Sequence, residues 1–261
     1  MRYTVFDIET RIDKSLVRAV YFPHAEEEGL SDDDTYRRMQ QRLREEQGSD
    51  FFPLSFHLPI SIAVGQVDEE RVLTGVETIP TADTAQSEAA EEALIRAFWE
   101  RLERFSGTLV SFNGRNFDLP VLELQALKYG CRIPRYFSGK ARYRFSDEGH
   151  YDLYDFLTNY GVHRLRGGFN ALAKLIGLPG KTDIDGSMVQ QLWEDGRLDD
   201  IHRYCRTDVI QTYFLFLRVE LLRGRITQQQ YDTAAEQSTS FLEDEAGSAN
   251  EIETPPSPNG K

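Results

Sequence analysis

A short run of β-forming residues, Tyr3-Thr4-Val5-Phe6-Asp7-Ile8, leads directly into Glu9-Thr10. Aromatic and β-branched residues favour strands, so the run predicts a buried strand. Alternation along a strand places the side chains of Asp7 and Glu9 on one face and Ile8 on the other. Two carboxylates on one face repel unless a cation lies between them, and Mg²⁺ prefers such oxygen ligands. An Asp-x-Glu pair alone is more often a solvated strand end.

The residues that follow alternate between strand-like and helix-like patterns. Strand-like runs cover 59–67, 71–76 and 108–112, and helical periodicity covers 84–105, 116–129 and 198–222. This order predicts a single α/β domain over residues 1–230, with a central mixed sheet flanked by helices. The charged stretch 32–47 predicts a helical insertion within residues 31–56, with Ser31 or Asp32 as its N-cap.

Composition excludes several classes of protein. Of the 261 residues, 40% are hydrophobic, but no apolar run is long enough to cross a membrane. Two cysteines, Cys131 and Cys205, are too few for a disulfide framework or a cysteine-rich zinc site. Asp7 interrupts the region where a secretory signal needs apolar residues. We therefore expect a cytoplasmic protein without a membrane partner.

The charge balance is acidic, with 43 acids against 30 bases and a net charge of −13. A generally basic, phosphate-seeking surface is therefore excluded, although basic residues could still be segregated on part of the surface. Residues 231–261 contain Pro and Ser, few large apolar side chains, and seven acids against Lys261 alone. This composition predicts an acidic, disordered tail from about Ala234.

A second acid follows a later strand. The apolar run 109–112 leads into the turn pair Asn113-Gly114, and Asp118 falls at the start of the next helix. The carboxyl ends of strands are where sites form in open α/β sheets. The alternative is helix capping, because Asn116 and Asp118 both suit a helix N-terminus.

A third acid lies within the last long helix. Tyr204 and Asp208 are four residues apart and share a face. A carboxylate on a partly apolar helical face needs a cation, a metal or a hydrogen-bond donor nearby. The alternatives are a Tyr–Asp hydrogen bond or an ion pair between Asp208 and Arg203 or Arg206.

The three motifs occur together, as Asp-x-Glu, Asn-x-x-x-Phe-Asp and Tyr-x-x-x-Asp in chain order. This combination resembles the DEDD exonucleases of the ribonuclease H-like fold. It is most similar to the exonuclease domain of B-family DNA polymerases and to stand-alone bacterial proteins predicted as exonucleases from that kinship. The resemblance covers about residues 1–225. Tyr204 marks the tyrosine branch, because Arg203 stands where the histidine branch would have its His.

The resemblance implies a 3′–5′ exonuclease in which four acids bind two divalent ions, Mg²⁺ or Mn²⁺. Phosphodiester hydrolysis needs an activated water and neutralisation of growing negative charge, which two metal ions about 4 Å apart supply. Tyr204 would orient the attacking water, because a phenol with a reference pKa near 10 is a positioning group rather than a base. The implied metal ligands are Asp7, Glu9, Asp118 and Asp208.

Substrate contacts are expected from the same motifs and from two acid-free basic stretches. Thr10, Asn113 and Phe117 would contact the nucleotide, although Phe117 could equally be core packing. Residues 128–145 interleave basic and aromatic side chains, which suits a single strand, and residues 156–182 combine basic residues with Gly167-Gly168, which allows close backbone approach. We expect substrate contacts from Arg142, Arg144 and Arg166. The alternative is that these loops pair with the acidic insertion.

Asp152 follows the first basic stretch. It is expected either to cap a helix or to lie near the metal ions as an outer residue, without binding them directly.

The leading hypothesis is a two-metal 3′–5′ exonuclease that acts on single-stranded or frayed DNA, as in DNA repair. One alternative is an RNA-trimming exonuclease of the same chemistry, because contacts to the 2′-hydroxyl cannot be recognised in a sequence. Another is a non-catalytic nucleic-acid-binding or scaffold protein. The insertion and the tail are candidate surfaces for a protein partner.

Overall fold

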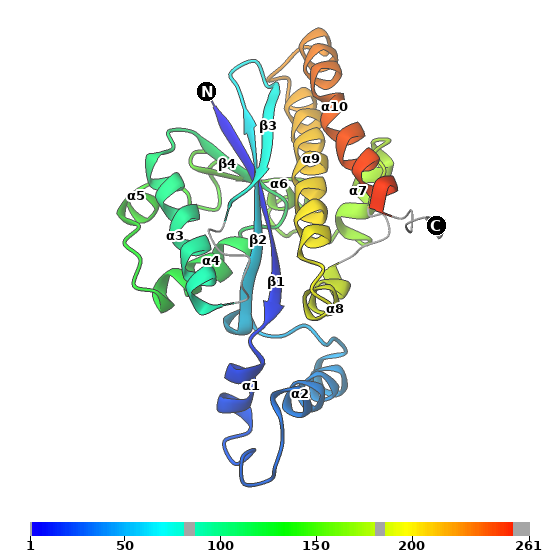
Figure 1. Ribbon diagram of the computed structural model, residues 1–261. Coiled ribbons are helices and arrows are strands. Elements are labelled where there is room, and N and C mark those ends of the chain that lie inside the picture. Colours follow the sequence, from blue (N-terminus) through cyan, green and yellow to red (C-terminus); the bar gives the residue numbers. More distant parts are fainter. Residues whose placement is uncertain (1, 81–86, 181–185, 253–261) are drawn as a thin grey trace, which may run out of the picture.

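The computed structural model describes residues 2–80, 87–180 and 186–252, with side chains described up to residue 245. Over these residues a mixed sheet lies at the centre, in the strand order β3-β2-β1-β4-β5 (Figure 1). The order is antiparallel from β3 to β1 and parallel from β1 to β5. The strands are β1 (Tyr3–Ile12), β2 (His57–Val67), β3 (Leu73–Thr78), β4 (Thr108–Ser111) and β5 (His150–Asp152).

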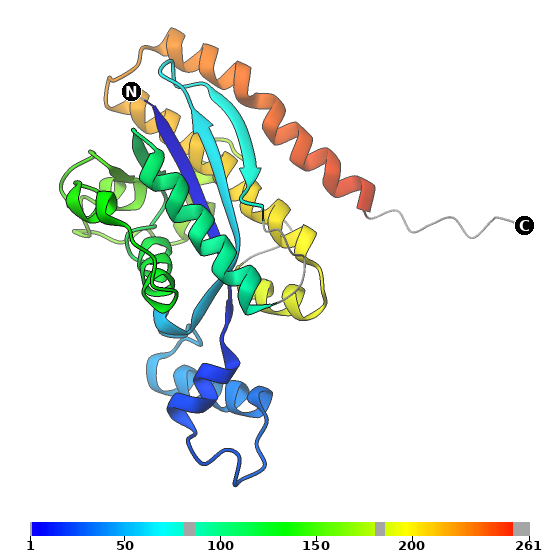
Figure 2. The same cartoon turned by 60° about the vertical axis from the view of Figure 1, so that its left-hand side comes forward.

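Helices cover both faces of this sheet (Figures 1 and 2). One face packs against α3 (Glu88–Arg104), α4 (Asp118–Lys128) and α5 (Pro134–Ser138). The other packs against α9 (Leu198–Leu222), which contacts α6 (Leu153–Leu157), α7 (Gly168–Leu175), α8 (Val189–Glu194) and α10 (Gln228–Ile252). Alternation along β1 explains the two layers, because Val5 belongs to the α9 core and Phe6 and Ile8 to the α3–α4 core. The predicted α/β sheet is confirmed.

One irregularity interrupts the pairing of β1 with β2. Glu9 is opposite Ser61, but Thr10 is opposite Pro59, so Ile60 is an extra residue on β2. The side chain of Ile60 is buried in a small apolar cluster that includes Tyr204 and the α8 residue Leu192. The bulge therefore supplies part of the packing beneath Tyr204.

The predicted helical insertion lies beyond the end of β1 (Figure 1). The predicted range 31–56 contains α2 (Asp32–Gln47) and the short 3₁₀ helix η1 (Leu54–Phe56). The inserted region begins earlier than predicted, because α1 (Lys14–Tyr21), which the sequence patterns did not indicate, packs against α2. Ser31 is the N-cap of α2 and forms a reciprocal capping box with Asp34, so that prediction is confirmed. The insertion has its own apolar cluster, which includes Val17, Met39, Leu43 and Phe52.

The prediction of a disordered tail is wrong as far as residue 252, because α10 occupies this segment and packs against α9 and β3. Small residues allow the close approach. Ala234 is buried, and Ser238 Oγ accepts a hydrogen bond from Leu73 N and bonds to the Tyr213 hydroxyl. Tyr231, Phe241 and Leu242 of α10 also pack against the α9 core. Residues 253–261 lie outside the described residues. In the part that is described, no helix is long and apolar enough to span a membrane.

Candidate active site

The site lies along an open edge of β1. β4 pairs with β1 only from Tyr3 to Val5, so the following residues of β1 have no strand on that side. Two backbone amides on this unpaired edge are instead bound by side chains. Ile8 N donates to Asp118 Oδ1 at 3.2 Å, and Ile12 N donates to Gln190 Oε1 at 2.7 Å. The start of α4 and helix α8 are thereby fixed against the strand that carries Asp7 and Glu9.

Three of the four predicted acids form one group. Ligand oxygens of Asp7, Glu9 and Asp208 lie within 4.8 Å of one another. Asp7 and Asp208 are half-buried, whereas Glu9 is only 8% exposed. Carboxylates that are this close together and shielded from solvent repel one another. A donor set made only of oxygen atoms matches a hard divalent cation. The residues present therefore fit the implied Mg²⁺ or Mn²⁺.

The fourth acid, Asp118, lies beside this group rather than within it. It does not cap α4, because Phe117 occupies the N-cap position and Asp118 instead accepts the amide of Ile8. It is 4% exposed, and this burial, with the charges of Asp152 and Asp208, raises the pKa of Asp118 to about 7. The raised pKa of Asp118 thus reflects its burial and the negative charge of neighbouring carboxylates.

Tyr204 points into the same group from α9. It is 7% exposed and hydrogen-bonds to the Asp208 carboxylate. Burial, reinforced by the charges of Asp208, Glu9 and Asp7, raises the pKa of its hydroxyl above the usual value, so the group keeps its proton and donates. The arginines proposed as alternative partners bind elsewhere: Arg203 binds Asp200 and Arg206 binds Glu245. The Tyr–Asp hydrogen bond is therefore present, and it lies at the acidic group.

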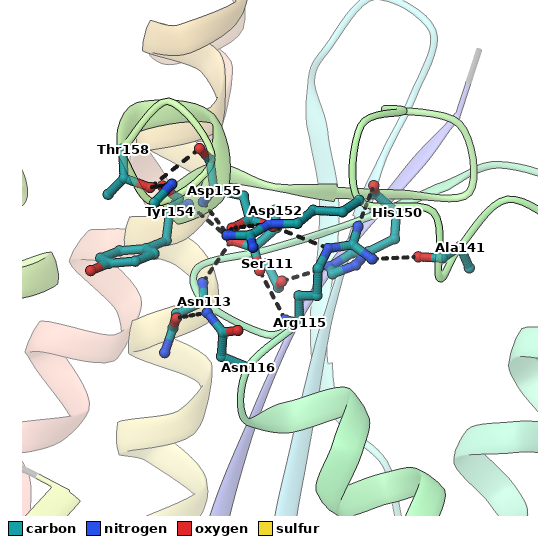
Figure 3. A network of polar contacts seen from close by, with 12 residues as sticks. Ser111, Asn113, Arg115, Asn116, Ala141, His150, Asp152, Tyr154, Asp155 and Thr158 are labelled. Atoms are coloured by element: carbon teal, nitrogen blue, oxygen red, sulfur yellow. Dashed lines mark hydrogen bonds and ion pairs between the residues drawn. The ribbon is translucent and has the colours of Figure 1, made fainter. Parts of the chain in front are cut away.

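Asp152 fixes the loop that precedes Asp118 (Figure 3). Its carboxylate accepts the amides of Asn113 at 3.0 Å and Arg115 at 2.8 Å, as well as the amides of Tyr154 and Asp155 at the start of α6. Asn113 adopts φ = +67°, a left-handed conformation that these bonds hold in place. Asp152 is therefore a helix cap that also anchors the loop of the second motif. Its predicted position near metal ions stays a prediction.

The basic stretch 128–145 pairs with acids of the main body, not with the insertion. Arg144 binds Asp155 through two of its nitrogens, and Arg142 lies 3.4 Å from Glu123. Lys140 similarly pairs with Glu148, and Lys128 with Glu88. Arg166, in the second stretch, is exposed and forms no ion pair with another described residue. The three arginines expected to contact substrate therefore differ in how free their charges are.

Sequence reasoning missed His57, which links the first motif to the second. Its Nε2 lies 3.1 Å from the carbonyl oxygen of Phe52, which can only accept, so Nε2 carries the hydrogen. Nδ1 then accepts from the Thr10 hydroxyl at 2.8 Å. The ring of Phe117 meets His57 edge-on, with centroids 5.1 Å apart, and is also partly buried against the α3–α4 core. A lone histidine carries no sequence signal for such a role.

Known proteins share this architecture. A family model described as "Predicted 3'-5' exonuclease related to the exonuclease domain of PolB" matches residues 49–254. The matched region contains Asp118, Tyr204 and Asp208 and begins after β1. No curated protein matches the chain.

A solved structure shows the same fold. The chain resembles the family B DNA polymerase from the hyperthermophilic archaeon Pyrobaculum calidifontis, with a TM-score of 0.52 and 15% identity. The match covers 95% of this chain and 29% of the polymerase chain. At this identity the likeness supports the fold, and the family model, which matches most of the chain, supports membership. The chain belongs to the family of predicted 3′–5′ exonucleases related to the exonuclease domain of PolB.

Proposed function

We propose that the chain is a metal-dependent 3′–5′ exonuclease that releases nucleotides from the 3′ end of single-stranded or frayed DNA. The observation that carries this proposal is the meeting of Asp7, Glu9 and Asp208, from segments about two hundred residues apart, at one point. Family membership supports the direction of cleavage, and the kinship with a DNA polymerase domain supports DNA as the substrate.

Asp7, Glu9 and Asp208 would hold divalent ions together with Asp118, which lies beside them. When bound, the ions activate the attacking water and neutralise charge that develops on the phosphate. Tyr204 would orient the attacking water by a hydrogen bond from its protonated hydroxyl, which would turn from Asp208 toward the water when substrate binds.

Substrate contacts would come from around the acids. Thr10 follows Glu9 and Phe117 precedes Asp118, so both would lie beside a terminal nucleotide held at the acids, and Asn113, in the same loop as Phe117, would join them. Arg166 is exposed and available to a phosphate. Arg142 and Arg144 would contact phosphates only while sharing their guanidinium groups with Glu123 and Asp155.

The test is hydrolysis of 3′- and 5′-labelled oligonucleotides in Mg²⁺ or Mn²⁺. Asp208→Asn should lower kcat/KM about a thousand-fold, because a metal ion supplies several kcal/mol of transition-state stabilisation. Tyr204→Phe should be milder, roughly ten- to a hundred-fold, as expected for a group that acts through another. Asp199→Asn, an exposed acid on the same helix, is the matched control and should leave activity unchanged.

Two outcomes would overturn the proposal. One is retention of the 3′ label with every metal, and the other is full activity in Asp208→Asn. Matched DNA and RNA strands distinguish the DNA exonuclease from an RNA-trimming enzyme. Calorimetric titration with Mn²⁺ distinguishes both from a scaffold, which needs no metal sites.

A further inference from the structure

The insertion places an exposed aromatic ring next to the second motif. Phe51 is 54% exposed, yet its ring is not isolated. Its centroid lies 5.0 Å from that of His57 and 5.7 Å from that of Phe117. His57 and Phe117 are themselves in edge contact. Three rings from three segments thus form one group, of which Phe51 is the most open to solvent.

This aromatic group is attached to the acids at two points. Phe117 directly precedes Asp118, whose carboxylate binds the strand between Asp7 and Glu9. Thr10 directly follows Glu9, and its hydroxyl holds His57. The second ring nitrogen of His57 is fixed by the carbonyl oxygen of Phe52, the neighbour of Phe51. The position of the Phe51 ring is therefore tied to the catalytic strand through short contacts.

We propose that Phe51, supported by His57 and Phe117, is a stacking surface for the base of the 3′-terminal nucleotide. The inference rests on the proposed exonuclease function and adds to it a specificity-determining residue from the insertion. An aromatic face accepts any base, so the contact would be indifferent to sequence. It would require an unpaired terminal base, because a base held in a duplex cannot lie against the ring.

The chemistry around the rings favours a base over a phosphate. The group contains no cation, and His57 stays neutral because burial lowers its pKa. Phosphate binding would need positive charge, whereas stacking needs an exposed π-face and a fixed ring. The backbone of the substrate would lie over the acids and the base against Phe51.

The experiment compares strands with an ordinary 3′-terminal nucleotide and strands with an abasic one. On ordinary strands Phe51→Ala should lower kcat/KM roughly ten-fold, the size of one base–aromatic stack. On abasic-terminated strands the same substitution should change nothing, because no base is present to stack. Phe51→Tyr should restore the wild-type rate. Leu222→Ala, at the end of α9 and 72% exposed, removes an exposed apolar side chain outside both basic stretches; it is the control and should behave as wild type on both strands.

A second readout does not depend on turnover. A strand with 2-aminopurine at its 3′ end and a hydrolysis-resistant phosphorothioate linkage should lose fluorescence on binding the wild type and Phe51→Tyr, but not Phe51→Ala. If Phe51→Ala quenches normally and keeps the wild-type preference for ordinary over abasic strands, the stacking surface is refuted. If the wild type hydrolyses neither strand, the exonuclease proposal fails instead.

Discussion

At the scale of single residues, His150 shows how burial alone sets a chemical state. It is fully buried in β5, where its Nε2 lies 2.8 Å from Ser111 Oγ. Burial, with a smaller contribution from the Arg115 charge, lowers the pKa of His150 to about 3. The imidazole of His150 is therefore neutral in the folded protein at any pH well above 3.

This neutrality makes the fold sensitive to acid. The unfolded chain binds a proton at His150 near pH 6.5, whereas the folded chain does not until about pH 3, so acid favours unfolding. Between pH 6 and 4.5 the wild type should lose about 1.4 kcal/mol of unfolding free energy per pH unit more than His150→Gln. Urea denaturation at several pH values measures this. Parallel pH profiles for the two proteins would contradict it.

The same scale shows what sequence could and could not reveal of the site. The spacing of Asp7 and Glu9, and that of Tyr204 and Asp208, predicts that the two side chains of each pair share a face, because each pair lies within one regular element. The hydrogen-bond partner of Asp118 could not be predicted from the sequence, because it is the backbone amide of Ile8, in a strand that is distant along the chain. His57 and Phe51 could not be found at all, since their roles depend on three-dimensional contacts between segments with no shared pattern.

At the scale of elements, Asp152 joins the start of α6 to the loop that leads into α4. Asp152→Asn removes one of the two oxygens that bind the loop amides, so the Arg115 amide then faces an NH₂ group. We expect a loss of about 1–3 kcal/mol of stability, together with lower kcat on oligonucleotides, because the loop also positions Asp118. Denaturation and kinetics on the same samples measure both effects.

A matched control separates capping from positioning. Ser87 caps α3 by accepting the Ala90 amide, far from the acids in the chain. Ser87→Ala should lower stability by about 1 kcal/mol but leave kcat unchanged. Should Asp152→Asn reduce stability and spare kcat in the same way, Asp152 would be a cap and nothing more.

Prediction of the elements succeeded where a helix or strand carries its own pattern. The limits of α9 agree with the sequence, and α2 begins at the expected cap. It failed for α10, because only a few large apolar residues, Tyr231, Phe241 and Leu242, stand among many polar ones, and further contacts come from small residues that bond to Tyr213 and β3. Composition counts the apolar side chains of a segment itself and contains no information about the surface against which the segment packs.

At the scale of the whole molecule, many basic side chains of the described residues are paired with acids. The protein has a net charge of −13, and the basic stretch 128–145 is bound to acids on α3, α4 and α6. Among the described residues, fewer cations are therefore free to displace counterions from a nucleic acid than the sequence alone would indicate. At fixed Mg²⁺, KM for a single strand should rise less than about ten-fold between 50 and 200 mM KCl. A rise of several hundred-fold would mean that the paired arginines open onto the phosphates.

The extra residue in β2 makes the position of the Tyr204 side chain depend on the number of residues in that strand. Ile60 exists as a bulge, and its side chain supports Tyr204 from below. A gene that lost this one codon would keep every acid and the pairing of residues 57–59 with β1, but it would remove the bulge and the side chain that packs beneath Tyr204. Deletion of Ile60 should therefore lower kcat on oligonucleotides more than Ile60→Val, which keeps the bulge and removes a single methyl group.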